Sequence, residues 1–318
     1  MVNAPLARRP SPPVSANVSA HMVNGVCRLC GEQADLRLSH IIPAFVFRWL
    51  RETSGTGHIR TSDEPNLRVQ DGIKRPWLCG PCEERLNRSE TEFATKVFHP
   101  YLASSGTRIR YSTWLMQFCT SLSWRVLKHY LEDDHLKKWE PETLERARTA
   151  ESAWRGVLLG TAPHAGACEQ HILPLDRIES TTGALAANIN RYLMRAIHMD
   201  ICRGSQSIFT YTKIGRFIVL GFVHEPQPNQ WKGTKVNANE GWIEPKQYVL
   251  PKAFGEYLNE KARDMAEDLD RMSDRQYEKV DQTFRQNVDR YVESDAFKAM
   301  NADVEMFGTE AFSKRGQK

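Results

Sequence analysis

Two closely spaced cysteine pairs constrain this chain more than any other feature of its sequence. Cys27 and Cys30 form one CxxC pair, and Cys79 and Cys82 form a second pair after a gap of 48 residues. Structural Zn²⁺ sites take four ligands in a tetrahedron, and one CxxC turn supplies two thiolates. The pairs therefore predict a structural zinc site. The gap is longer than the usual spacing, so it must contain structure of its own.

The other cysteines favour metal binding over disulfide chemistry. The total of seven is odd, and Cys119, Cys168 and Cys202 are isolated in the sequence. A secreted disulfide framework would look different, so we expect reduced thiols in the cytoplasm. Two alternatives remain. The thiol pairs are incidental, or CGPC is a redox motif similar to that of thioredoxin, although the expected strand–helix context is absent.

Composition indicates a folded chain preceded by an arm. Of the 318 residues, 41% are hydrophobic and eight are tryptophan, which predicts a buried core. No apolar window is long enough for a transmembrane helix, so no membrane partner is expected. Residues 1–24 are rich in Pro, Ser and Ala and lack the apolar run of a signal peptide. We expect them to form a disordered arm.

The order of the patterns predicts an α+β fold in three parts after the arm. Residues 25–100 would form a treble-clef or ββα zinc module, residues 101–250 a mixed α+β domain of unassigned role, and residues 251–318 a charged helical segment. Within the module we expect a strand at 36–42, a helix at 44–52, a long loop at 53–75 and a helix from the second CxxC to about residue 98.

Apolar periodicity divides the later region further. Helical spacing predicts helices at 109–131, 141–159 and 183–201. Residues 205–224 read as a hairpin, with further strands at 171–175 and 241–250. Residues 251–306 are highly charged and helical, either continuous or in two pieces.

The module resembles the HNH (ββα-metal) endonucleases that carry a structural four-cysteine zinc. That family shows a CxxC, a strand like D-H-I-x-P, an Asn, and LCxxCN at the start of a helix. This chain has Ser39-His40-Ile41-Ile42-Pro43 and Leu78-Cys79-Gly80-Pro81-Cys82-Glu83 in the matching positions. The resemblance covers residues 25–98, under a quarter of the chain.

The resemblance implies a role for each matching residue. His40 matches the general base that deprotonates the attacking water, and a free imidazole titrates near pH 6.5, at about the right range for this task. Asn66 is the nearest counterpart of the asparagine that orients the histidine. Glu83 stands where the family usually binds the catalytic ion, Mg²⁺ or Mn²⁺. Asn87, one turn further along the helix, is a second candidate ligand, and Glu90 a third.

One departure from the family pattern bears directly on activity. The family commonly has a metal-binding aspartate just before the histidine, and here that position is Ser39, a poor ligand for a hard cation. Glu83 is a carboxylate where a neutral Asn is usual. The site would then keep one negative charge, moved from the strand to the helix, which suits Mg²⁺ bound with substrate phosphate.

Each candidate also has a purely structural interpretation. The ring of His40 would only cap the zinc knuckle. Glu83 would be a first-turn glutamate that is stabilised by the helix dipole. Glu90 would be a packed or solvent-facing helix residue, and Asn66 a turn former. In the nuclease interpretation too, the zinc would hold strand and helix in register and do no chemistry.

The basic residues permit a nucleic-acid partner without requiring one. The net charge is +4, and the cations between the cysteine pairs alternate with acidic residues. The candidate phosphate contacts are Arg48, Arg51, Lys74, Arg75, Arg108 and Arg110.

These observations predict a metal-dependent endonuclease acting on DNA, by analogy the effector of a bacterial defence system. The region after residue 100 would bind a regulatory protein or ligand, or contact DNA. The alternative is a catalytically silent zinc module that binds nucleic acid or protein, and Ser39 is its best support.

Overall fold

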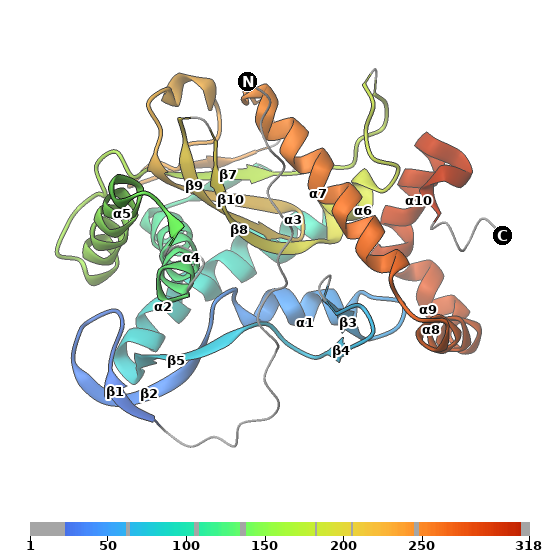
Figure 1. The fold of residues 1–318 in the computed structure, drawn as a ribbon, viewed down its shortest axis with the longest axis horizontal. Coiled ribbons are helices and arrows are strands. Elements are labelled where there is room, and N and C mark those ends of the chain that lie inside the picture. The colour runs from blue at the N-terminus through green and yellow to red at the C-terminus, as the bar shows by residue number, and fades with distance from the viewer. Residues whose placement is uncertain are drawn as a thin grey trace.

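The computed structural model describes residues 23–61, 64–104, 108–133, 138–181, 183–204, 206–244 and 248–312. The fold is α+β, with a cysteine cluster near the N-terminus and a helical C-terminal region, as predicted (Figure 1). The predicted arm at 1–24 lies outside the described residues, except that Val23 and Asn24 belong to the first strand.

The N-terminal module is a small antiparallel sheet that leads into a helix. Strands β1 (Val23–Val26), β2 (Gln33–His40) and β5 (Lys74–Cys79) pair in the order β1-β2-β5. Helix α2 (Gly80–Phe93) follows β5 at once. Pro81 suits its first turn, because the N–H that proline lacks has no partner there. The cysteine pairs therefore lie at the β1–β2 turn and at the β5–α2 junction.

The segment between the cysteine pairs contains more structure than the sequence predicted. Helix α1 (Ala44–Glu52) has the predicted bounds, but the predicted loop at 53–75 contains two short paired strands. These are β3 (Ile59–Arg60) and β4 (Arg68–Val69). Ile59 and Val69 face each other in this pair and are both buried, which explains why such short strands form.

A four-stranded antiparallel sheet forms the centre of the molecule. Its order is β7 (Gln170–Pro174), β10 (Phe217–His224), β9 (Ile208–Ile214) and β8 (Ile197–Arg203). The β9–β10 hairpin was predicted, whereas β8 corrects the helix predicted at 183–201. Only α6 (Ile189–Arg195) is helical there. Pairing along the whole of β9 outweighs the local helical pattern.

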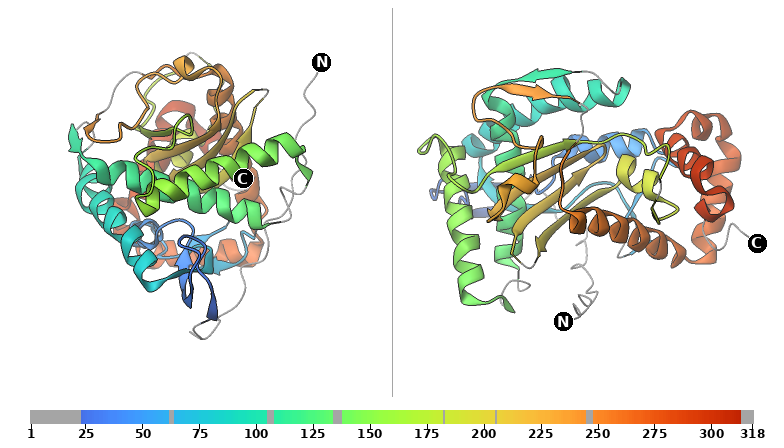
Figure 2. Two further views of the ribbon diagram at one scale, coloured as in Figure 1. Left: turned by 90° about the vertical axis from the view of Figure 1, so that its left-hand side faces the viewer. Right: turned by 90° about the horizontal axis from the view of Figure 1, so that it is seen from above.

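Helices cover both faces of this sheet. Leu115 and Phe118 of α4 (Thr113–Glu132) pack with Phe217 and Val219, while Phe254 of α7 (Lys252–Asp270) packs with residues of the other face. Helix α5 (Pro141–Leu159) lies beside α4, as Figure 2 shows from two sides. The helix predicted at 109–131 starts late, because β6 (Ile109–Tyr111) pairs with β11 (Gly241–Ile243).

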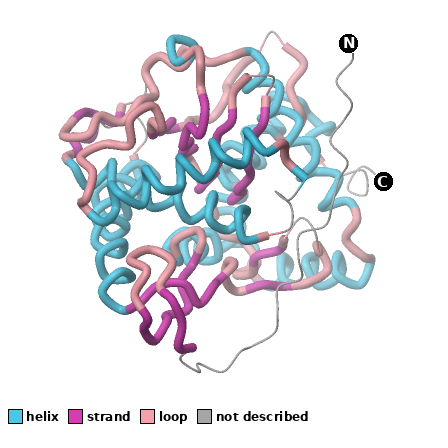
Figure 3. Tube along the Cα trace, turned by 60° about the vertical axis from the view of Figure 1, so that its left-hand side comes forward, coloured by secondary structure: helices cyan, strands magenta, loops and turns pink. Residues whose placement is uncertain are grey.

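The module shares its core with the rest of the chain. Trp124 and Trp154 pack in one buried cluster with Cys27 and Leu78, and a second cluster joins Trp49 to the central sheet. After α2 the chain continues through a π-helix at 94–98 and α3 (His99–Ala103). Figure 3 shows the strands of the module apart from the central sheet, with helices between them. The predicted boundary at residue 100 is therefore crossed by packed side chains.

The C-terminal region is helical, as predicted, and consists of separate helices of unequal length. They are α7 (Lys252–Asp270), α8 (Asp274–Gln286), α9 (Val288–Glu293) and α10 (Asp295–Phe307). Figure 1 shows α8 and α9 beside β3 and β4. Within the described ranges, no helix has both the length and the apolar character needed to cross a membrane.

Candidate functional site

The four predicted cysteines form one compact cluster. The Sγ atoms of Cys27, Cys30, Cys79 and Cys82 all lie within 4.8 Å of one another, and those of Cys30 and Cys79 are 3.8 Å apart. A tetrahedral ion with Zn–S bonds of about 2.3 Å would hold its sulfurs about 3.8 Å apart. The cluster therefore has the size and the ligand chemistry of a structural zinc site.

Local backbone geometry orients these sulfurs and affects their charge. The backbone N–H of Cys79 donates to Cys27 Sγ at 3.4 Å. Burial would raise the pKa of Cys27, but the amides of Cys30, Cys79 and Leu29 lower it to about 7. Burial, and next the neighbouring thiol of Cys79, raise the pKa of Cys82. Four thiolates in this space repel one another, so a bound cation is what would keep them all ionised.

The end of β2 carries a hydrogen bond between Ser39 and the helix. Ser39 is fully buried, and its hydroxyl donates to Glu83 Oε2 at 2.5 Å. Glu83 lies in the first turn of α2, directly after Cys82 of the cysteine cluster. The Glu83 carboxylate, which was predicted to replace the missing strand aspartate, therefore lies next to Ser39, the position that this aspartate would occupy.

His40, the last residue of β2, pairs with a carboxylate on the other side of the strand. Its Nε2 lies 2.8 Å from Asp71 Oδ2, which also accepts from Lys74 Nζ at 2.7 Å. Burial would raise the pKa of Asp71, but the hydrogen bonds from His40, Lys74 and the Gly72 amide hold it well below its usual range. The His40 side chain keeps 20% of its surface exposed, so it does not point into the module core.

Successive side chains of a strand point to opposite faces. Ser39 accordingly faces α2, whereas His40 faces the loop before β5. The two polar pairs lie on either side of the strand end rather than in one hydrogen-bond network.

A buried arginine from α4 fixes the same strand end. Arg125 Nη1 donates to the backbone oxygen of His40 at 2.8 Å, and its Nη2 forms an ion pair with Glu90 and a 2.8 Å hydrogen bond to Ser121 Oγ. Arg125 is 2% exposed. Glu90 is thus a packed helix residue with a buried partner, the interpretation that sequence reasoning set beside metal binding.

The two predicted asparagines have other surroundings. The side-chain oxygen of Asn66 accepts from the backbone N–H of Ser273 at 2.8 Å, so Asn66 contacts the start of α8. The ring of His40 is held instead by Asp71. Asn87 is exposed on α2, one turn after Glu83.

Most of the predicted basic residues are already engaged. Lys74 pairs with Asp71, Arg108 with Glu244 at 2.9 Å, and Arg110 with Glu240 at 2.5 Å. Arg51 donates to the backbone oxygen of Gln70. The side chains of Arg48 and Arg75 have no hydrogen-bond or ion-pair partner among the residues that the structure describes.

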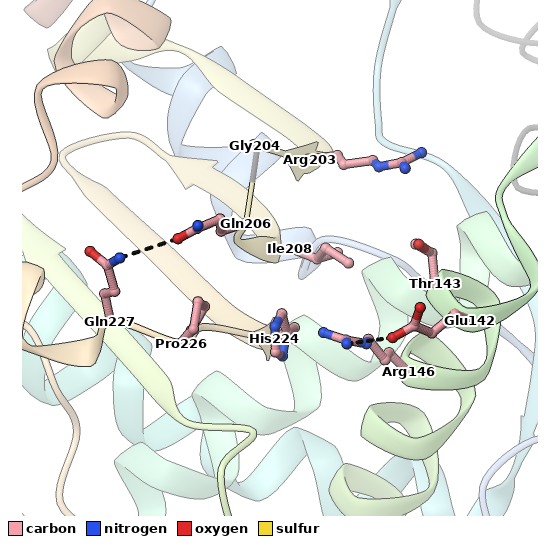
Figure 4. Close-up of a pocket in the computed structure, with 10 residues that line it drawn as sticks. All are labelled: Glu142, Thr143, Arg146, Arg203, Gly204, Gln206, Ile208, His224, Pro226 and Gln227. Carbon is pink, nitrogen blue, oxygen red and sulfur yellow. Dashed lines mark hydrogen bonds and ion pairs between the residues drawn. The ribbon is translucent and has the colours of Figure 1, made fainter.

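A hollow of about 600 Å³ lies elsewhere, between α5 and the ends of β8, β9 and β10 (Figure 4). Arg146, Arg203 and His224 line it, and Arg146 donates to Glu142 at 2.6 Å. None of the site residues predicted from the sequence lines this hollow.

Comparison of the chain with models of protein families, with curated proteins and with solved structures finds no match.

Sequence reasoning missed two residues at this site, Asp71 and Arg125. Asp71 is the acidic residue just before β5, and its distance of 31 residues from His40 hides the contact. In the sequence, Arg125 is a cationic residue next to Val126, which belongs to the apolar stripe of the helix predicted at 109–131. A charged residue at such a position needs a buried partner, which is the signal that would have identified it.

Proposed function

We propose that this protein is a metal-dependent endonuclease of the HNH type that hydrolyses phosphodiester bonds in DNA. The observation that carries the proposal is the 2.5 Å hydrogen bond between Ser39 and Glu83. It supports a carboxylate beside the strand position that lacks the usual aspartate, on the face of β2 opposite to the His40 ring. The zinc cluster would hold β2 and α2 in register and would take no part in the chemistry.

His40 is the general base in this proposal. With Nε2 donating to Asp71, the neutral ring carries its lone pair on Nδ1, and that atom would accept the proton of the attacking water. Asp71 orients the ring and stabilises the imidazolium that forms, as a carboxylate does in other histidine pairs. Arg125 fixes the backbone of His40 by donating a hydrogen bond to the carbonyl oxygen of His40.

Glu83 would hold the catalytic Mg²⁺ or Mn²⁺ together with oxygens of the substrate phosphate, and Asn87 is the next candidate ligand along the helix. Such an ion neutralises charge on the phosphate and on the leaving oxygen. Mg²⁺ keeps several of its waters, so one protein carboxylate plus phosphate is a sufficient ligand set. We further propose an effector role in bacterial defence, by analogy with other nucleases that are joined to a larger domain.

A second candidate function is a catalytically silent zinc module that binds nucleic acid or protein. The observation that favours it is that Ser39 and His40 face opposite sides of β2, so Glu83 and the His40 ring belong to separate hydrogen-bonded pairs. Glu83 would then be a structural residue.

Nicking of supercoiled plasmid separates the two functions. Wild-type protein with Mg²⁺ or Mn²⁺ is compared with His40→Ala and Glu83→Gln, and with His164→Ala as a control at an exposed histidine outside the module. The nuclease proposal expects activity that His40→Ala and Glu83→Gln abolish and His164→Ala retains. Nicking that survives His40→Ala contradicts the catalytic assignment. Tight plasmid binding without nicking under either metal supports the silent module.

A further inference from the structure

Some basic side chains of the module already form an ion pair or a hydrogen bond, whereas others have no such partner among the described residues. A phosphate that binds an ion-paired arginine must compete with the carboxylate already there, so free arginines are the better candidates for DNA contacts. Of the six cations predicted from the sequence, this leaves Arg48 and Arg75. The candidates that follow residue 100, Arg108 and Arg110, are both paired with residues at 240–244.

A third arginine whose side chain lacks a partner of this kind is Arg37 of β2, which was not among the candidates predicted from the sequence. Its guanidinium lies next to the first residue of α2. Arg37 is exposed on β2, and its Nη2 is 3.7 Å from the place where a Cβ on Gly80 would lie. Gly80 precedes Glu83 by three residues, so the two share one side of the helix. The Arg37 side chain therefore lies over the helix turn that carries Glu83, and its guanidinium has no hydrogen-bond or ion-pair partner among the described residues.

Arg75 approaches the same carboxylate from the neighbouring strand. It is the cross-strand partner of Ser39, and residues directly opposite in a sheet project to the same face. Ser39 donates to Glu83, so the face of Arg75 is the face of Glu83. Arg37 and Ser39 are two residues apart on β2, about 7 Å along the strand.

We propose that Arg37 and Arg75 form a pair of phosphate contacts that holds a DNA duplex across Glu83, one on each side of the bond to be cleaved. Guanidinium groups bind phosphate through two parallel hydrogen bonds, which fixes the backbone without reading its sequence. This inference rests on the proposed nuclease function, since it takes Glu83 as the place where the substrate phosphate binds.

The test measures binding separately from cleavage. Full-length wild-type protein and two double variants, Arg37→Gln/Arg75→Gln and Arg108→Gln/Arg110→Gln, are titrated into a fluorescent DNA duplex of mixed sequence without added Mg²⁺. Anisotropy gives the dissociation constant at a series of salt concentrations. Zinc content and thermal melting establish that each variant is folded.

The slope of log affinity against log salt should fall in magnitude by about 1.8 for Arg37→Gln/Arg75→Gln, since each lost phosphate contact removes about 0.9. The matched variant at Arg108 and Arg110 should keep the wild-type slope. An unchanged slope at Arg37 and Arg75, an equal loss in the matched variant, or wild-type protein that does not bind the duplex would overturn the proposal. Tighter, Arg37-dependent binding of RNA would overturn DNA as the partner.

This result is independent of the nicking assay. If His40→Ala leaves nicking intact while the salt slope still depends on Arg37 and Arg75, the catalytic assignment fails and the phosphate contacts stand. If the slope is unaffected and His40→Ala abolishes nicking, the catalytic assignment stands and the phosphate contacts fail.

Discussion

Arg125, in the middle of α4, donates a hydrogen bond from Nη1 to the backbone oxygen of His40 at 2.8 Å. The two residues are 85 positions apart, and the same guanidinium forms an ion pair with Glu90 of α2. A helix that follows the zinc module in the sequence thus fixes the strand end on which the candidate general base lies. The module and the later helices have to fold together for His40 to take this position.

Arg125→Met should destabilise the protein strongly. The substitution leaves Glu90, of which 16% is exposed, without its buried partner. Breaking a buried pair by removing one charge costs about 3–5 kcal/mol, and the remaining exposure of Glu90 places the expected loss near the lower end. Urea unfolding measures the change. Arg146→Met is the control, because its pair with Glu142 is an exposed i,i+4 contact worth about 0.5 kcal/mol or less. A loss for Arg125→Met no larger than that of the control would contradict the assignment.

Purified protein should contain one zinc per chain, and a single cysteine substitution should remove it. Cys30 and Cys168 are both half-buried free thiols, but only Cys30 belongs to the cluster. Cys30→Ser should lose zinc and lower the melting temperature, whereas Cys168→Ser should keep the metal. Elemental analysis and thermal melting measure both effects. Stoichiometric zinc in Cys30→Ser, or a reversible Cys79–Cys82 disulfide in zinc-free wild type, would instead support the alternatives to a zinc site.

Much of the module could be predicted because its signals are local. Spacing of the cysteines, Pro81 at the helix start and the apolar stripe of α2 each act over a few residues, and α1 has the predicted bounds. The contacts of the candidate site are different. Asp71 reaches His40 over 31 positions and Arg125 over 85, and no periodic pattern encodes such distances.

The same distinction explains the errors outside the module. Residues 197–201 belong to the predicted helix, yet they form most of β8 because β9 offers a complete pairing partner. Residues 109–111 leave the predicted helix to pair with β11, which lies 130 positions later. In both places a long-range strand partner outweighs local propensity, and a single sequence does not show that partner.

Acidification should destabilise the protein in part through His171. This residue is 2% exposed, and its burial lowers its pKa from 6.5 to about 4, although Glu169 acts in the opposite direction. Between these values the unfolded chain binds more protons than the folded one, so the free energy of unfolding rises with pH across this window. From pH 6.5 down to pH 5, wild type should lose about 2 kcal/mol by this route.

His171→Gln should remove that part of the pH dependence. Glutamine does not titrate and can still bond to Thr234, which contacts His171 Nδ1 at 2.6 Å. The comparison is the difference in free energy of unfolding between wild type and variant, measured with urea at pH 5 and pH 6.5, where any loss of zinc is common to both. A difference that does not change between the two pH values would show that His171 does not contribute.

The C-terminal helices should be coupled energetically to the segment between the cysteine pairs. A Cβ on Gly55 would lie 2.2 Å from Cδ2 of Tyr291, an aromatic residue of α9. Gly55→Ala must therefore displace the Tyr291 ring or the segment that carries Gly55, and overpacking of this kind costs about 1–3 kcal/mol. Tyr291→Ala removes the obstacle, so the alanine at position 55 should then be tolerated.

A double-mutant cycle measures this coupling. The loss in the free energy of unfolding for Gly55→Ala should be clearly smaller in the Tyr291→Ala background than in wild type, by about 0.5–3 kcal/mol, because contacting residues are not additive. Gly255→Ala in α7 is the control, since among the described residues its added Cβ would meet nothing within 4 Å beyond the adjacent residues and backbone of α7 itself, and alanine favours a helix. It should be neutral or stabilising in both backgrounds. Additive losses for Gly55→Ala and Tyr291→Ala would mean that α9 does not hold this segment in solution, and the contact of Asn66 with Ser273 would then be expected to break as well.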